Sequence, residues 1–132
     1  MGDRRENERV VRRTLDAVNG RDVAELQACF HADVSWFETG RDNPLGGPYR
    51  GIGEVLTFLA ARFEQSADTL AIDVHDVVAG DEHVVALVRL TGARGDRRLD
   101  DRSVFVVHVD DGLVREIWSY AEDQTGIDGF WG

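Results

Sequence analysis

HVVALVRLTGARGDRRLDDRSVFVVHV, residues 83–109, predicts two β-strands joined by a tight turn. Valine, leucine and phenylalanine dominate both halves, and the turn-forming residues "RGD" separate them. In residues 83–94, one alternating set is wholly apolar and consists of Val84, Ala86, Val88 and Leu90. Because successive strand side chains point to opposite faces, this set forms one buried face. The stretch is therefore expected to be a hairpin in a sheet packed against helices.

Two further strands are expected beside this hairpin. Residues 69–79 precede it and residues 113–121 follow it, and both are rich in β-branched side chains. Turn signals, "GDE" before residue 83 and "DDG" before residue 113, separate them from the hairpin. Four strands with such short connections predict an antiparallel meander.

The N-terminal half has a helical pattern. Residues 5–19 carry an apolar stripe and end at Asn19-Gly20, a helix stop signal. A capping box, "DVAE", begins a second helix over about 22–30, and a third helix begins at Gly51. Between them lie a short strand, 34–38, and a loop, 39–50. Residues 41–49 of this loop are expected to border a pocket entrance. Helices followed by strands predict the α+β class, with helices packed on one face of a curved sheet.

The remaining strand faces indicate where a site and an interface lie. In residues 98–109, Asp101, Ser103, Phe105, Val107 and Val109 share a face that is expected to point inward. Asp101 and Ser103 would then form the polar end of an apolar surface, as binding sites commonly require. The second face of 83–94 carries Val85 and Leu87 beside Arg89, so it faces either water or a partner subunit. We expect a homodimer through this sheet.

Composition excludes several functions. The 132 residues suit one domain, 1–132, and a net charge of −10 argues against nucleic-acid binding. All 15 basic residues are arginine, so no lysine is available for Schiff-base catalysis. No apolar run has the length of a membrane span, and the N-terminus lacks a secretory pattern. The single cysteine, Cys29, cannot form an internal disulfide, which fits an expected cytoplasmic location.

No motif for a cofactor or metal is present in the sequence. The four histidines, His31, His75, His83 and His108, lack metal-ligand spacing. A glycine-rich dinucleotide motif, a P-loop and a nucleophile elbow are also absent. The expected activity therefore uses neither a cofactor nor a metal.

Glu38 is the candidate that the strand pattern singles out. It follows Trp36 and Phe37 at the end of the short strand. It is either an exposed strand-end acid or a base held at the mouth of a pocket. In the second case, the aromatic neighbours would desolvate the carboxylate and raise its pKa.

The whole pattern resembles the NTF2-like superfamily, and within it the SnoaL-like and ketosteroid-isomerase-like branch. The resemblance rests on "NGRD", "FHADV", "YRGIGE" and "EIWSYAEDQ", and it covers about residues 6–131. It implies a cone: a curved, mainly antiparallel sheet wrapped around three N-terminal helices and enclosing one apolar pocket. Members of the superfamily include isomerases, cyclases, epoxide hydrolases, dehydratases and proteins that only bind a ligand or partner, so the fold does not fix the function.

Site residues carry over from this resemblance position by position. The base of ketosteroid isomerase corresponds to Glu38. The two residues that donate hydrogen bonds to the oxyanion in that enzyme, a tyrosine and a protonated aspartate, correspond to Thr14 and to a position at or near Ser103. Neither residue type is kept here, although Asp101 lies two residues before Ser103. The acid that follows the last strand of SnoaL-type cyclases corresponds to Glu122 or Asp123. Asp101 and Asp123 are therefore secondary polar candidates.

The resulting hypothesis is a small cofactor-free enzyme that isomerises, cyclises or dehydrates an apolar polycyclic or terpenoid-like molecule. Ser103 would contact the substrate, and four aromatic residues would shape the cavity: Trp36, Phe105, Trp118 and Tyr120. The alternatives are a non-catalytic small-molecule-binding protein and a dimeric interaction module of the same fold. The terminal aromatics, Phe130 and Trp131, are expected to plug the cone or to pack across a dimer.

Overall fold

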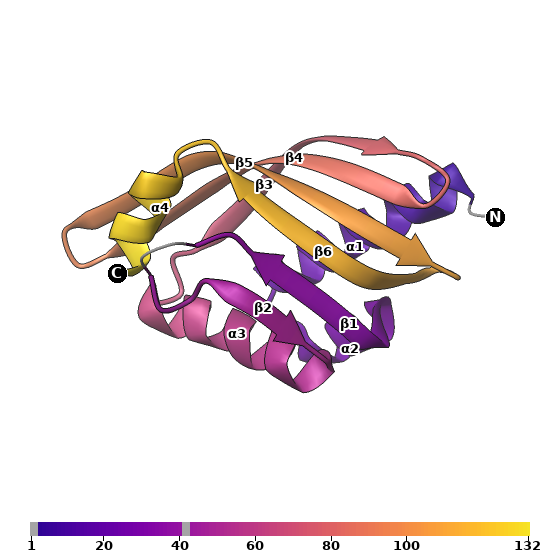
Figure 1. The fold of residues 1–132 in the computed structure, drawn as a ribbon, viewed down its shortest axis with the longest axis horizontal. Helices are drawn as coiled ribbons and strands as arrows, with labels where there is room; N and C mark the ends of the chain where they lie inside the picture. Colours follow the sequence, from indigo (N-terminus) through magenta and orange to yellow (C-terminus); the bar gives the residue numbers. More distant parts are fainter. Residues whose placement is uncertain (1–2, 41–42) are drawn as a thin grey trace.

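The computed structural model describes residues 3–40 and 43–132 and has four helices and six strands within them (Figure 1). The helices are α1 (Arg4–Asn19), α2 (Val23–Cys29), α3 (Ile52–Gln65) and α4 (Gln124–Trp131). The strands are β1 (Phe30–Glu38), β2 (Gly47–Arg50), β3 (Ala71–Ala79), β4 (His83–Arg94), β5 (Arg97–Asp110) and β6 (Leu113–Ala121). The helix-then-strand order confirms the predicted α+β class.

All six strands form one sheet in the order β2-β1-β6-β5-β4-β3. Neighbouring strands are antiparallel except β1 and β6, which are parallel. The predicted meander is confirmed as β3 to β6. Parallel pairing of β1 with β6 brings the N-terminal strand beside the last strand, so Glu38 lies opposite Ser119.

The helices cover one face of this sheet. α1 packs mainly on β3 and β4, whereas α3 packs on β1 and β2 (Figure 1). Gly51 has a φ of 85°, in the left-handed region that favours glycine, and it begins the turn from β2 into α3. As the alternation predicts, the inward face of β4 is buried, and so is that of β5.

Local signals in the sequence set the helix ends. Asp22 accepts a hydrogen bond from the Glu25 amide at 3.1 Å, as the predicted capping motif requires. Gly20 ends α1 as its C-cap. No described helix is long and apolar enough to span a membrane.

Three elements differ from the sequence prediction. The first strand begins at Phe30 rather than residue 34, and the loop 39–50 contains strand β2; its residues 41–42 lie outside the described part. The tail forms helix α4, with Asp123 as its N-cap. Glycines at 126 and 129 disfavour a helix in isolation, so packing decides this element.

Helix α4 closes one end of the cone with its aromatic residues. Phe130 and Trp131 are 3% and 2% exposed within a single chain, so they dock on their own fold. The carbonyl of Phe130 accepts a hydrogen bond from Arg94 Nη1 at 2.7 Å. Elsewhere in the core, a void between α1 and strands β5 and β6 measures only about 10 Å³.

Phe130→Ala should lower the free energy of unfolding by about 3–5 kcal/mol, because it leaves a cavity where α4 meets the sheet. Urea denaturation measures this loss. Val23→Ala is the control, since Val23 is 52% exposed and its truncation should cost far less. Equal losses for both variants would show that α4 is not part of the core.

Candidate functional site

Glu38 is the centre of the candidate site. It shares the inward face of β1 with Trp36, two residues earlier, whereas Phe37 points to the other face. Its side chain is 7% exposed, although it also lines a pocket of about 840 Å³ at this end of the sheet. The exposed-acid reading is therefore wrong, and Glu38 is a buried carboxylate at a pocket wall.

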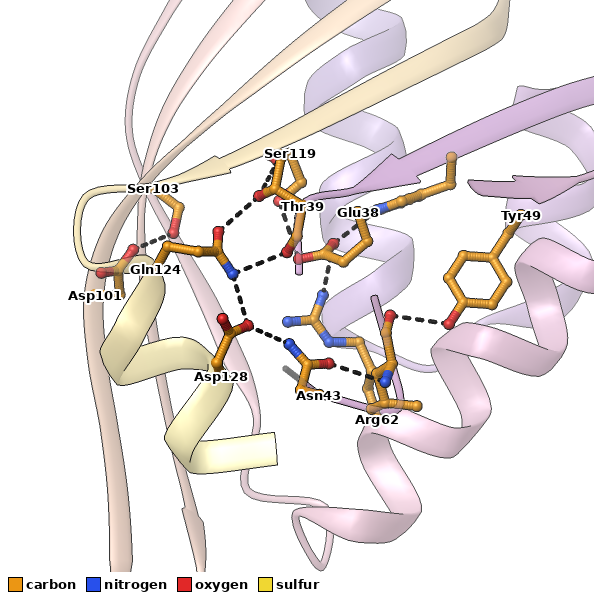
Figure 2. Close-up of polar contacts among 12 residues, drawn as sticks. Glu38, Thr39, Asn43, Tyr49, Arg62, Asp101, Ser103, Ser119, Gln124 and Asp128 are labelled. Carbon is orange, nitrogen blue, oxygen red and sulfur yellow. Dashed lines mark hydrogen bonds and ion pairs between the residues drawn. The ribbon is translucent and has the colours of Figure 1, made fainter. Parts of the chain in front are cut away.

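Three donors surround the Glu38 carboxylate (Figure 2). Trp36 Nε1 donates to Oε1 at 3.0 Å, and Arg62 Nη1 donates to the same oxygen at 3.3 Å. The Ser119 hydroxyl reaches Oε2 at a longer 3.5 Å. Oε1 thus accepts from two donors, while Oε2 has only one weak contact among residues 3–40 and 43–132 and keeps its capacity to accept a proton.

Arg62 is the partner that sequence reasoning missed. It lies on α3 with a side-chain exposure of 4%, and its guanidinium lies 5.2 Å from the Phe58 ring and 5.0 Å from the Trp131 ring. The helical spacing in the sequence does indicate that Arg62 is buried. Residue 62 follows Leu59 by three positions and Val55 by seven, which places it in the apolar stripe of the helix. An arginine at such a position indicates a buried partner.

Burial and Arg62 have opposite effects on Glu38. Burial raises the pKa of Glu38, and this effect outweighs the lowering by the Arg62 charge and by the hydrogen bonds from Trp36 and Ser119. Burial, and secondarily the Glu38 charge, also raises the pKa of Tyr49. Tyr49 stacks on Phe58 and donates its hydroxyl to the Leu45 carbonyl at 2.9 Å. The pocket wall therefore holds a carboxyl group whose proton is retained at higher pH than usual.

A polar network joins the end of β1 to α4 (Figure 2). Gln124 Nε2 donates to the Thr39 carbonyl at 3.0 Å and to Asp128 Oδ1 at 2.9 Å. Asn43 Nδ2 donates to the same Asp128 oxygen at 2.6 Å. Gln124 and Asp128 line the pocket together with the aromatic residues Phe37 and Tyr120. The pocket lining thus combines polar and apolar side chains.

Asp101 and Ser103 are buried, as expected, but they serve the turn into α4. Asp101 accepts hydrogen bonds from the Ser103 hydroxyl at 2.6 Å and from the amides of Glu122 and Asp123 at 3.2 and 3.0 Å. Asp101 is four residues along β5 from Phe105, which pairs with Ser119 beside Glu38. Four strand residues span about 13 Å, so the structure does not bring Asp101 and Glu38 together.

The other predicted residues divide between the two faces. Trp36 and Phe105 are buried on the inward face and contact each other, with ring centroids 5.8 Å apart. Trp118 lies on the outer face and stacks on Phe37 at 5.6 Å, so its expected position in the cavity is corrected. Ile117 and Ser119 occupy the inward positions of β6, which leaves Trp118 and Tyr120 outside.

The two acids after the last strand have structural positions. Asp123 caps α4 by accepting a hydrogen bond from the Gly126 amide at 3.0 Å, and Glu122 is exposed. Neither lines the pocket that contains Glu38. Within residues 3–40 and 43–132, no group of three or more His, Cys, Asp or Glu side chains could hold a metal ion.

The comparisons with known proteins identify the family. Residues 11–117 match the SnoaL-like domain, and the chain belongs to this family of NTF2-like fold. An uncharacterised protein of Mycobacterium tuberculosis (strain H37Rv) is 32% identical over 123 residues, covering 92% of this chain and 93% of the relative. Bal32a, from a soil-derived mobile gene cassette, is 25% identical with a TM-score of 0.94, and 98% of each chain is covered.

More distant structures share the fold alone. A putative SnoaL-like polyketide cyclase from Jannaschia sp. CCS1 is 19% identical with a TM-score of 0.80, covering 98% of this chain and 94% of its own. A putative ketosteroid isomerase from Kribbella flavida is 23% identical, with a TM-score of 0.73 and coverage of 93% and 82%. TerC, co-crystallised with polyporic acid, is 16% identical, with a TM-score of 0.84 and coverage of 95% and 97%.

The raised pKa of Glu38 makes stability depend on pH in a definite direction. Between the ordinary and the raised pKa, the folded state keeps a proton that the unfolded chain has released. The free energy of unfolding should therefore fall as pH rises through this window, and Glu38→Gln should remove this part of the slope. Carbon-13 NMR titration measures the pKa directly, with the Glu38 signal assigned by its loss in Glu38→Gln.

Two variants test the cause of the shift. Arg62→Met removes the cation that lowers the Glu38 pKa, so the pKa should rise further. Asp101→Asn is the control, because Asp101 serves a separate turn and its loss should leave the Glu38 titration unchanged. A Glu38 pKa at or below the ordinary value would contradict a buried carboxylate, and a response to Asp101→Asn would place both acids in one site.

Proposed function

We propose that this protein is a cofactor-free acid–base enzyme in which Glu38 transfers a proton within an apolar small molecule. Proton transfer of this kind underlies isomerisation, cyclisation and dehydration. The observation that carries the proposal is a carboxylate with a raised pKa in the wall of a pocket of about 840 Å³. A general base works best when its pKa lies near the working pH, and burial moves Glu38 in that direction.

The pocket supports a flat, largely apolar substrate. Phe37, Pro48 and Tyr120 supply apolar surface, while Thr39 and Gln124 supply polar groups. Arg50 lies at the rim, with its guanidinium 5.4 Å from the Phe37 ring. The names of the fold relatives, a putative cyclase, a putative isomerase and a protein crystallised with polyporic acid, agree with a cyclic substrate.

The role of Glu38 can be tested without the natural substrate. Nitrobenzisoxazole is a flat bicyclic compound that loses one carbon-bound proton to a base while its N–O bond breaks, giving a coloured phenolate. We expect the protein to accelerate this elimination and Glu38→Gln to lower the rate by about 10²–10⁴, a range typical for a general base. The glutamine keeps the shape of the side chain and an acceptor oxygen for Trp36 and Arg62.

Glu64→Gln is the matched control, because Glu64 is an exposed carboxylate on the same helix as Arg62. It should leave the elimination rate unchanged. Equal rates for the wild type and Glu38→Gln would overturn the catalytic role of Glu38. Binding of the probe without turnover would instead favour the alternative of a non-catalytic ligand-binding protein.

We also propose a homodimer through the outer face of the sheet. This face carries apolar side chains that a single chain leaves exposed, with Leu87 at 37% and Val78 at 59%. The Phe37–Trp118 stack lies on the same face and extends its apolar area. Covering such side chains with a second copy would remove apolar area from water, at about 25 cal/mol per Å².

Leu87→Asp should convert the dimer into a monomer, since it places a charge in the centre of the apolar face. Sedimentation at micromolar concentration measures the mass. Val23→Asp, an exposed apolar position on α2, is the control and should leave the dimer intact. A wild-type monomer under these conditions would contradict the proposed assembly.

A further inference from the structure

The buried guanidinium of Arg62 has hydrogen-bond donors that no described residue satisfies. In the described part of the chain, only Nη1 has a partner, Glu38, whereas Nε and Nη2 have none. The indole Nε1 of Trp131, whose ring lies 5.0 Å from the guanidinium carbon, also lacks an acceptor. Buried donors without partners are costly and rare, so their presence points to an acceptor that comes from outside the chain.

The geometry of the free donors indicates what kind of acceptor fits. Nε and Nη2 form one edge of the planar guanidinium, and this edge presents parallel donors to oxygen atoms. The side chain carries a permanent positive charge in a nearly water-free position. An oxygen that bears or develops negative charge is therefore favoured over a neutral one, because a low dielectric strengthens the attraction.

The positions expected to hold the oxyanion donors cannot provide them. The Thr14 hydroxyl donates to the Val10 carbonyl at 2.7 Å, within its own helix. The Ser103 hydroxyl donates to Asp101 at 2.6 Å. Both hydroxyl protons are committed, whereas the donors of Arg62 are free and belong to the residue that already contacts the candidate base.

We propose that the free Nε–Nη2 edge of Arg62 binds the carbonyl oxygen of the substrate and the negative charge that develops on it. This inference rests on the proposed function and narrows it: the substrate is an apolar compound with an enolisable carbonyl group. Trp131 covers the guanidinium and excludes water, and its Nε1 is a further donor beside it. The last turn of α4 must yield slightly to admit the oxygen.

The reaction is balanced without a co-reactant. The Glu38 carboxylate takes a proton from the carbon next to the carbonyl. The electron pair of the broken C–H bond forms a C=C bond, and the C=O π electrons move onto the oxygen, where Arg62 holds the charge. Where the substrate also carries a C=C bond beside the deprotonated carbon, the enolate is conjugated, and Glu38 returns the proton to its far carbon, which restores the carbonyl and completes an isomerisation.

Nitrophenol tests this assignment, because its ionised form resembles an enolate: a flat ring with a charged oxygen. We expect nitrophenolate to bind in the ionised form, as measured by its absorbance. The ¹⁵N-bound protons at Arg62 Nε and Trp131 Nε1 should shift in NMR spectra as it binds. Nitroanisole, which lacks the charged oxygen, should leave both signals in place.

Arg62→Lys keeps the charge but loses the planar edge, so affinity for nitrophenolate should fall about ten- to a hundredfold. Arg21→Lys is the matched control, since Arg21 also lies over a phenylalanine ring but on an exposed part of the surface. Glu38→Gln should bind nitrophenolate more tightly, because it removes the competing negative charge. The NMR shifts in the wild type give an answer even if Arg62→Lys does not fold.

Three results would overturn the assignment: no binding of nitrophenolate, equal affinity in Arg62→Lys, or NMR shifts confined to pocket-lining residues such as Tyr120 and Gln124. Unchanged Arg62 and Trp131 signals would mean that water alone satisfies these donors. The elimination assay separates this outcome from the role of Glu38. A Glu38-dependent elimination with no nitrophenolate at Arg62 refutes the carbonyl site and leaves the base intact.

Discussion

The buried ion pair between Glu38 and Arg62 is the interaction on which the rest of the site depends. Taking two charges out of water costs several kcal/mol per ion, and their attraction offsets this only when the remaining polar atoms find partners. Among the described residues the pair is incomplete: Glu38 Oε2 has one long contact, and two nitrogens of Arg62 have none. An incomplete pair contributes little to stability, but it leaves hydrogen-bonding atoms available to a ligand, as a binding or catalytic site requires.

The fold places this pair by simple strand and helix geometry. The period of two in β1 puts Trp36 and Glu38 on the inward face, so the indole donates directly to the carboxylate. Parallel pairing with β6 places Ser119 opposite Glu38, and α3 passes below with Arg62 on its buried face. Helix α4 then covers the arginine with Trp131 and supplies one wall of the pocket. Each element contributes one contact, and none is catalytic alone.

The fold could be predicted from sequence because its signals are local. Alternation in residues 83–109 defined the hairpin and its buried faces, and turn residues defined the meander. The sequence did not predict strand β2, because it begins with Gly47-Pro48, or helix α4, because it contains two glycines. Packing on β1 stabilises β2, and packing on β5 stabilises α4.

The candidate site was predictable only in part. The aromatic neighbours of Glu38 marked it as a candidate. Its link to Arg62, 24 residues away, depends on how α3 crosses the sheet, which the sequence does not state. Trp118 alternates with Tyr120 as predicted, but alternation alone does not tell which face is inside.

The central claim is that Glu38 is the base, and the pH dependence of the elimination reaction tests it most directly. The pH profile of kcat/KM reports the pKa of the essential base in the free enzyme. The account predicts that kcat/KM for nitrobenzisoxazole rises with pH around one pKa. This kinetic pKa should equal the raised pKa of Glu38 measured by carbon-13 NMR. In Arg62→Met, the kinetic pKa and the NMR pKa should both move upward by the same amount. A kinetic pKa that differs from the Glu38 titration, or that stays fixed when Arg62 is replaced, would contradict it.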